Sequence, residues 1–137
     1  MARKSRKGQQ NNPVNKRPIY VAGLYARISV NDDGENTSVL NQIEYIRDFL
    51  KQNDDITVYD IYVDDGVSLF NKNRPSFTKM IDDVRAKKIN CIVVNDISRF
   101  SRDYIEAIEY IDYLFPLFQV RFISIFDGYD SLHSDVS

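Results

Sequence analysis

The sequence predicts an α/β domain with a mainly parallel central sheet of four or five strands and helices on both faces. Segments rich in β-branched and aromatic residues, typical of strands, alternate with segments whose apolar residues recur every three or four positions, typical of helices. The predicted order is four strands with a helix between each strand and the next. One strand-like segment, INCIVVN at 89–95, is apolar almost throughout, as expected of a central strand covered on both faces. The length of 137 residues, 43% of them hydrophobic, suits one domain with a single core.

The first half of the chain predicts a strand, a helix and a second strand. IYVAGLYARI, residues 19–28, is the first strand, and the polar loop SVNDDGEN follows it. Thr37 or Ser38 can then cap a helix, because apolar residues follow at helical spacing. The residues expected on its inner face are Val39, Leu40, Ile43, Ile46, Phe49 and Leu50. ITVYDIYV, residues 56–63, is the second strand.

The second half predicts two more helices and two more strands. Pro75 suits the first turn of a helix that turns Phe77, Met80, Ile81 and Val84 toward the core. After the central strand, a third helix is expected to start near Arg102 or Asp103 and to end near Pro116. Its inward residues are expected to be Ile105, Ile108, Ile111 and Leu114 or Phe115. VRFISIF, residues 120–126, is the fourth strand.

Charge is segregated along the chain. Residues 1–17 hold six bases and no acid, which leaves 12 bases against 20 acids in the remainder. We expect residues 1–18 to form a flexible basic arm, either a solubilising tail or an arm that contacts DNA phosphates, and residues 19–137 to form the domain. An acidic body does not indicate a general DNA-coating surface, so any nucleic acid must be bound by a local basic cluster or a further domain.

Several functional classes are disfavoured by what the sequence lacks. The single cysteine, Cys91, lies in the apolar run at 89–95 and is expected to be a buried small hydrophobe. With one histidine, His133, a histidine-based metal centre or a Ser-His triad is not indicated. No apolar stretch approaches the ~20 residues that span a bilayer, and we expect a cytoplasmic protein. The absence of GxxxxGK[ST] and GxGxxG gives no indication of a nucleotide cofactor.

Charged and hydroxyl residues follow the predicted strands, where the carboxyl ends of a parallel sheet gather functional groups. These residues are Arg27 and Ser29, then Asp64, Asp65, Ser68 and Arg74, then Asp96, Ser98, Arg99, Ser101, Arg102 and Asp103, then Asp127 and Asp130. Guanidinium groups bind phosphate oxygens bidentately and stay charged, so four arginines near a serine favour nucleophilic attack on a phosphodiester by Ser29. Taken alone, Ser29 would be a capping or loop serine, and metal-binding carboxylates remain possible at Asp64, Asp65 and Asp96.

Four motifs in this order resemble the serine recombinases of the resolvase/invertase type, in particular the catalytic domain of the large serine recombinases of transposons and phages. The motifs are YARIS, TSVLNQ, YVDDGVS followed by RPSF, and SRFSRD, and they span about residues 20–130. The resemblance implies a resolvase-like catalytic fold and site-specific DNA recombination. It also implies a serine that cleaves each strand to form a 5′-phosphoserine and a free 3′-OH, strand exchange by rotation within a synaptic tetramer, and rejoining without ATP, metal or another cofactor.

The resemblance assigns roles by position. Ser29 would be the nucleophile, with Arg27, Arg74, Arg99 and Arg102 around the phosphate. The supporting residues would be Tyr25, Gln42, Ser68 and an aspartate that is either Asp64 or Asp65. We expect the arginines to be solvent-accessible, so that their loss affects cleavage more than folding.

Two positions depart from the family pattern. Ser98 stands where many members have aspartate, and Leu69 where glycine is usual. These departures keep open a non-catalytic assembly or regulatory module with the recombinase fold. A second alternative is a receiver-like signalling domain with Asp96 as the phosphate acceptor.

The resemblance further implies DNA as substrate, a homodimer and a synaptic homotetramer. It also implies a long helix and DNA-binding domains that this chain lacks, so we expect weak, nonspecific DNA binding by residues 1–137 alone.

Overall fold

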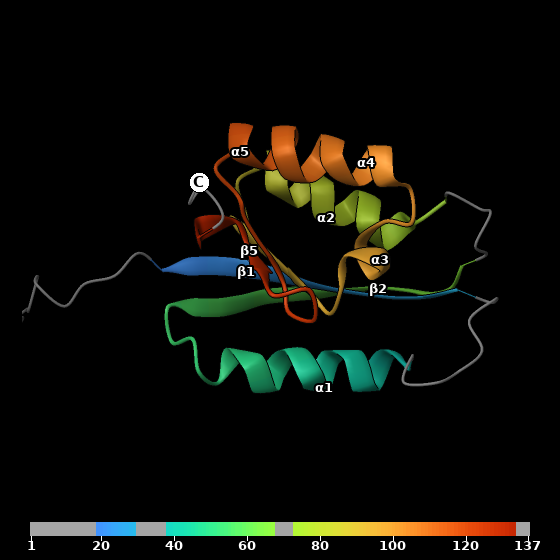
Figure 1. Cartoon of the computed structure of the whole chain (residues 1–137), viewed down its shortest axis with the longest axis horizontal. Coiled ribbons are helices and arrows are strands. Elements are labelled where there is room, and N and C mark those ends of the chain that lie inside the picture. The colour runs from blue at the N-terminus through green and yellow to red at the C-terminus, as the bar shows by residue number, and fades with distance from the viewer. Residues whose placement is uncertain (1–18, 30–37, 68–72, 134–137) are drawn as a thin grey trace, which may run out of the picture.

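A five-stranded sheet forms the centre of the molecule in a computed structural model that describes residues 19–29, 38–67 and 73–133 (Figure 1). The strands lie in the order β2-β1-β3-β4-β5. Four pair in parallel and β5 pairs with β4 in the antiparallel direction. Their bounds are β1 Tyr20–Ser29, β2 Ile56–Val67, β3 Cys91–Val94, β4 Arg121–Ser124 and β5 Tyr129–Asp130. The predicted fold class is therefore confirmed. The expected arm at 1–18 lies outside the described residues.

Helices cover both faces of the sheet, as predicted. Helix α1, Val39–Leu50, lies on one face, and α2, Pro75–Arg85, lies on the other (Figure 1). Helix α4, Tyr104–Ile108, shares the face of α2 and continues through a π-helical segment, Glu109–Leu114, into α5, Phe115–Leu117. Two short helices were not predicted from the sequence: α3 at Ile97–Phe100 and a 3-10 turn at Ser131–His133. No helix of the described residues is long and apolar enough to cross a membrane.

Helix α1 begins where the sequence predicts. Ser38 is its N-cap, and the Ser38 hydroxyl accepts a hydrogen bond of 3.0 Å from the Asn41 backbone N–H. Ile43 and Ile46 are buried beneath the sheet. The prediction that Leu40 faces the core was wrong, because 67% of this residue is exposed. Leu40 lies in the first turn, where a spacing of three from Ile43 places it at the margin of the apolar stripe.

The larger core lies between the sheet and α2. Pro75 occupies the first turn of α2, and its predicted inner residues Phe77, Met80, Ile81 and Val84 are all buried. Cys91 is fully buried in β3, and burial raises the pKa of its thiol to about 12, so it behaves as the small hydrophobe that was expected.

The inner face of the third predicted helix differs from the expectation. Its start is confirmed, since Asp103 caps α4, but Ile105 is 64% exposed, and the predicted inward position was wrong. Ile105 lies in α4 itself, where Ala107 is the buried residue, and two positions along an α-helix are about 200° apart, so Ile105 falls on the opposite side. Beyond α4, the π-helical segment winds more loosely than 3.6 residues per turn, and Pro116 lacks the N–H that an α-helix would bond to the Asp112 carbonyl. The residues that pack inward are Ala107, Tyr110, Ile111, Leu114 and Phe115.

The sheet order determines where a site can form. Strand β1 lies between β2 and β3, and the helix after β1 covers the opposite face from the helix after β2. In open α/β sheets, functional groups gather beyond the carboxyl ends of the strands at such a position. Strand β2 runs on to Val67, so Asp64 and Asp65, expected in a loop, belong to the strand and pair with Arg27 and Ile28 of β1.

Candidate active site

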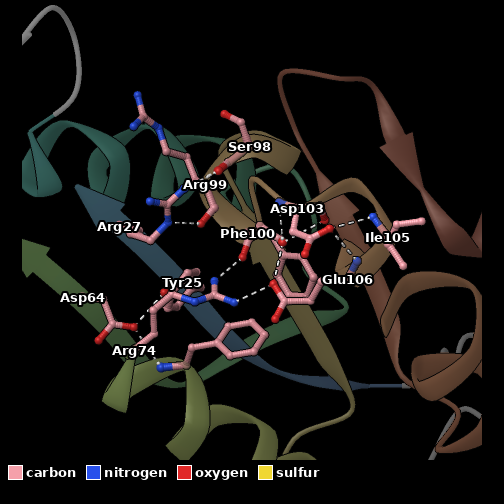
Figure 2. Close-up of polar contacts among 12 residues, drawn as sticks. Tyr25, Arg27, Asp64, Arg74, Ser98, Arg99, Phe100, Asp103, Ile105 and Glu106 are labelled. Atoms are coloured by element: carbon pink, nitrogen blue, oxygen red, sulfur yellow. Dashed lines mark hydrogen bonds and ion pairs between the residues drawn. The ribbon is translucent and has the colours of Figure 1, made fainter. Parts of the chain in front are cut away.

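Arg27 lies near the carboxyl end of β1 and reaches toward α3 (Figure 2). Its Nε donates a hydrogen bond of 3.1 Å to the Arg99 carbonyl, and its Nη2 donates to the Ser98 carbonyl. The expectation that Arg27 is accessible was wrong, since 4% of the residue is exposed. These two carbonyl oxygens accept hydrogen bonds from part of the guanidinium's N–H donors, and because carbonyls are neutral they do not cancel its charge.

Gln42 fixes the end of β1 from the face of the sheet that α1 covers. It is a fully buried residue of α1, and its side chain bonds the Arg27 backbone twice. The amide Nε2 donates to the Arg27 carbonyl at 3.1 Å, and Oε1 accepts from the Arg27 N–H at 3.2 Å. A buried polar side chain on an apolar helix face is stable when its donors and acceptors are paired in this way. Gln42 therefore fixes the backbone of the residue two positions before Ser29.

Ser29 is the last residue of β1, and only its backbone is described. It pairs with Val67, whereas the preceding Ile28 pairs with Asp65, so a β-bulge in β2 lies beside the end of β1. Side chains alternate along a strand, so Tyr25 and Arg27 belong to one face of β1. Ser68 lies outside the described residues.

Asp64 connects β1, β2 and the start of α2. It accepts a hydrogen bond of 2.7 Å from the Tyr25 hydroxyl and further bonds from the backbone N–H groups of Ser76, at 2.9 Å, and Phe77, at 3.0 Å. A carboxylate at a helix N-terminus satisfies otherwise unpaired N–H groups and interacts favourably with the helix dipole. Asp64 is buried and Asp65 is exposed, so Asp64 is the aspartate of the pair that contacts Tyr25 and α2.

Burial raises the pKa of the Tyr25 hydroxyl, and the hydrogen bond to Asp64 raises it further, while the nearby charge of Arg74 acts in the opposite direction. The phenol is therefore neutral at physiological pH and acts as a hydrogen-bond donor. Tyr25 is fully buried, with its ring edge-on to Phe77 at a centroid distance of 5.6 Å.

Arg74 precedes α2, and its guanidinium stacks on the Phe77 ring at 3.9 Å from the centroid. Its Nη1 donates to the Phe100 carbonyl, and its Nη2 donates to Glu106 Oε1 at 3.0 Å (Figure 2). With 10% of its side chain exposed, Arg74 is also less accessible than expected. Arg27 and Arg74 thus bind three consecutive carbonyls, those of residues 98, 99 and 100.

The SRFSRD segment carries the other two predicted arginines. Arg99 lies on α3, with Nε 3.8 Å from Asp96 Oδ2 and 14% of its side chain exposed. The expected accessibility therefore fails for Arg99 as well and holds for Arg102, which is exposed. Asp96 caps α3, because its Oδ1 accepts from the Arg99 N–H at 3.0 Å and from the Ser98 hydroxyl. Ser98, which replaces the aspartate of many family members, is thus bonded to the neighbouring carboxylate.

The sequence did not predict the contact of Glu106 with Arg74, or that backbone carbonyls of α3 accept hydrogen bonds from Arg27 and Arg74. The spacing Asp103-x-x-Glu106 is that of a capping box, which would predict a local bond from Glu106 to the start of its own helix. The carboxylate instead contacts Arg74, 32 positions away in sequence, and the Ser101 hydroxyl. Among the described residues, no group of three His, Cys, Asp or Glu side chains lies close enough together to hold a metal ion.

Comparison with known families identifies this arrangement. The family model described as resolvase, N terminal domain, matches residues 22–135. The chain belongs to this family. It is therefore the catalytic domain of a serine recombinase, an enzyme of site-specific DNA recombination. The resemblance based on the four sequence motifs is confirmed, and the receiver-like alternative is not supported.

Solved structures similar to the recombinase domain agree with its fold. The N-terminal catalytic domain of TP901-1 integrase matches with a TM-score of 0.74 and 23% identity, over 83% of this chain and 84% of that one. A resolvase family site-specific recombinase from Streptococcus pneumoniae matches with a TM-score of 0.72 and 25% identity, over 85% and 78% of the two chains. The C-terminal catalytic domain of ISC1926 TnpA, an IS607-like serine recombinase, matches with a TM-score of 0.63 and 24% identity, over 77% and 69%. No curated protein sequence matches the chain.

Proposed function

We propose that Ser29 is the nucleophile of this recombinase and that Arg27, Arg74, Arg99 and Arg102 bind the phosphate it attacks. The Ser29 Oγ forms a bond to phosphorus and loses its proton, while the bond from phosphorus to the 3′-oxygen breaks and that oxygen is protonated. The product is a 5′-phosphoserine and a free 3′-OH. Reversal of the same step, by the 3′-OH of an exchanged strand, rejoins the DNA and releases Ser29.

The observation that carries the proposal is the contact between Arg27 and α3. Arg27 precedes Ser29 by two residues in β1, and its guanidinium binds the carbonyls of Ser98 and Arg99. The strand end with the serine and the segment with Arg99 and Arg102 therefore lie side by side. Guanidinium groups around one phosphate would stabilise the charge of the transition state without a metal ion.

The supporting residues would orient these groups. Gln42 fixes the backbone of Arg27, and Asp64 fixes the N-terminus of α2, next to Arg74. Tyr25 would serve as a hydrogen-bond donor, because its raised pKa keeps the phenol protonated and unsuited to removing the Ser29 proton. Ser68 would complete the polar set, by its position in the YVDDGVS motif.

DNA recombination requires two sites to be brought together, so we propose that the enzyme acts as a homodimer on each site and as a homotetramer when two sites pair. Its DNA substrate would place the activity in the cytoplasm. The closed C₂ symmetry common among homodimers suits a site with two equivalent strands.

A trapping experiment tests the proposal. The recombinase is incubated with a duplex that contains its recombination site and a nick on the 3′-OH side of the cleavage position. The short 3′-OH fragment dissociates, so rejoining is prevented and a covalent protein–DNA band persists on a denaturing gel. We expect the wild type and Ser98→Ala, the matched control at the same sheet edge, to give this band, and Ser29→Ala to give none. A covalent band in Ser29→Ala, or its absence in the wild type under conditions that pair two sites, would overturn the proposal.

A further inference from the structure

Glu106 occupies a position between α2, α3 and α4 that no role assigned above uses. It lies in the first turn of α4, and its Oε1 accepts two hydrogen bonds, one of 3.0 Å from Arg74 Nη2 and one of 2.6 Å from the Ser101 hydroxyl. About a third of its side chain is exposed (32%), whereas Ser101 is buried. Glu106 therefore links a buried arginine to the segment between α3 and α4.

Arg74 depends on few contacts for its orientation. Stacking on the Phe77 ring confines the guanidinium to a plane but leaves it able to rotate within that plane. The bond from Nη1 to the Phe100 carbonyl supplies one in-plane anchor, and the bond from Nη2 to Glu106 supplies a second. Arg74 also lies close enough to the Tyr25 hydroxyl to affect its pKa, and each added anchor on a rigid planar fork narrows the orientation of the guanidinium.

The Glu106 carboxylate is itself fixed from two sides. The Ser101 hydroxyl donates to it, and the backbone of Glu106 is fixed because Asp103 Oδ1 caps the first turn of α4, accepting from the N–H groups of Ile105 at 3.0 Å and Glu106 at 3.3 Å (Figure 2). The Asp103 N–H in turn donates to Ser101 Oγ at 3.1 Å. Ser101, Asp103 and Glu106 thus form one hydrogen-bonded unit at the start of α4.

We propose that Glu106 is a positioning residue of the recombinase, which orients the Arg74 guanidinium for binding of the scissile phosphate. The inference rests on the proposed role of Arg74 in that phosphate site. Glu106 acts through its hydrogen bond geometry: its carboxylate fixes Nη2, and Ser101 fixes the carboxylate. An arginine that is free to rotate binds the transition state less well, because its rotational entropy is then lost as the transition state forms, and this loss raises the barrier.

The opposite role, in which Glu106 competes with phosphate for Arg74, makes a different prediction. Removing a competitor would speed cleavage, while removing an anchor slows it. Glu106→Gln separates geometry from charge, since the amide oxygen can still accept from Arg74 and Ser101 while the negative charge is lost.

The test measures the rate of covalent complex formation by the complete recombinase on the nicked duplex described above, at saturating DNA. We expect Glu106→Ala to slow cleavage about ten- to hundredfold. Glu106→Gln should slow it about threefold or less, because the hydrogen bonds remain. Glu109→Gln, an exposed glutamate in the next turn, is the matched control for loss of one negative charge and should cleave at the wild-type rate. Thermal melts and DNA-binding assays on each variant separate the cleavage rate from folding and affinity.

A double-mutant cycle with Arg74→Ala shows whether Glu106 acts through Arg74. We expect Glu106→Ala to add no further loss in the Arg74→Ala background. An equal loss in both backgrounds would overturn the positioning role, and so would wild-type or faster cleavage by Glu106→Ala while Arg74→Ala is slow. Normal cleavage by Arg74→Ala would instead overturn the proposed phosphate site itself. If Glu106→Ala fails to fold, a rate of Glu106→Gln more than about tenfold below that of the control overturns the proposal, because the retained hydrogen bonds should suffice.

Discussion

Two arginines with little exposed surface, Arg121 and Arg74, lie at opposite ends of the strands and show two different uses of the same side chain. Arg121 begins β4 at the amino edge of the sheet and binds two carboxylates. Asp130 accepts from its Nε at 3.0 Å and from its Nη2 at 2.7 Å, and Asp55 accepts from its Nη1 at 3.2 Å. Arg74, at the carboxyl edge, binds one carboxylate and one carbonyl. Both stack on aromatic rings, Arg121 on Tyr20 at 4.8 Å and Arg74 on Phe77 at 3.9 Å.

The difference lies in how much of the positive charge is balanced. Two carboxylates more than neutralise Arg121, and the hydrogen bonds that Arg121 donates to Asp130 raise the pKa of its guanidinium despite burial. The Arg27 side chain donates to the carbonyl oxygens of Ser98 and Arg99, and Arg74 contacts one carboxylate where Arg121 contacts two. The charge of an arginine paired with two acids is fully balanced, whereas a guanidinium that meets fewer acids keeps more of its charge available to a phosphate.

The largest effect on stability should come from Arg121→Met. The substitution leaves Asp55 and Asp130 without their shared cation in a partly buried position, and breaking such a pair costs about 3–5 kcal/mol of unfolding free energy. Urea unfolding at pH 7 measures the loss. The folded fraction should cleave DNA at the wild-type rate, because Arg121 lies at the opposite edge from Ser29. A normal urea midpoint together with slow cleavage would contradict the division between the two edges.

Arg27→Ala and Arg102→Ala should separate catalysis from folding. In the proposed phosphate site, each variant would lack one donor to the transition state, and we expect cleavage to slow by about two to three decades, or roughly 3–4 kcal/mol. Arg27→Ala should in addition destabilise the fold by about 1–3 kcal/mol, because the carbonyls of Ser98 and Arg99 lose a buried donor. Arg102 is exposed, and its loss should change stability by no more than about 0.5 kcal/mol. Single-turnover cleavage and thermal melts on both variants check this contrast, and equal melting temperatures would contradict it.

Stability at the Arg121 edge should depend on acid pH through Asp130. Burial disfavours the charged carboxylate, but the hydrogen bonds from Arg121 and from the Leu132 N–H outweigh it and lower the pKa of Asp130 below its ordinary value of 3.8. As the pH falls below this value, the unfolded chain takes up the proton first. The stabilisation is therefore present above about pH 4 and is lost as the pH falls through the folded-state value.

Asp130→Asn tests the assignment. Unfolding free energies from urea titrations at pH 7, 5 and 3 should decline less steeply for the variant than for the wild type, with the wild type more stable at pH 7. Parallel curves for the two proteins would show that Asp130 does not carry this pH dependence. Asp83, whose pKa is lowered mainly by the hydrogen bond from Tyr62, is present in both proteins and cancels in the comparison.

The smallest effect is expected at a surface ion pair. Lys51 Nζ lies 3.3 Å from Asp48 Oδ1, but their side chains are 76% and 73% exposed. Solvent screens such a pair, so Lys51→Met should change the unfolding free energy by about 0.5 kcal/mol or less. Measured beside Arg121→Met by urea unfolding, it shows how much of the larger loss comes from burial. A loss of similar size in both variants would remove burial as the explanation.

The order of strands and helices and the sheet edge at which the polar residues gather followed from the sequence. Local patterns determine both, because the period of apolar residues distinguishes strand from helix and parallel strands end at one edge. Ser38 as a cap, Pro75 in a first turn and the buried side of α2 were likewise predictable from neighbouring residues. The π-helical segment was not, and neither was the outward position of Ile105 in the first turn of α4.

The tertiary structure alone decided which of these polar groups meet and how deeply they are buried. Arg27 binds the carbonyl of a residue 72 positions away, and Tyr25 binds an aspartate 39 positions away. Such contacts depend on the register of β2 against β1 and on the packing of α2 and α3, which no local period encodes. The register and packing therefore made Asp64 rather than Asp65 the partner of Tyr25. They also buried Arg27, left Arg74 and Arg99 only partly accessible, and brought Glu106 to Arg74.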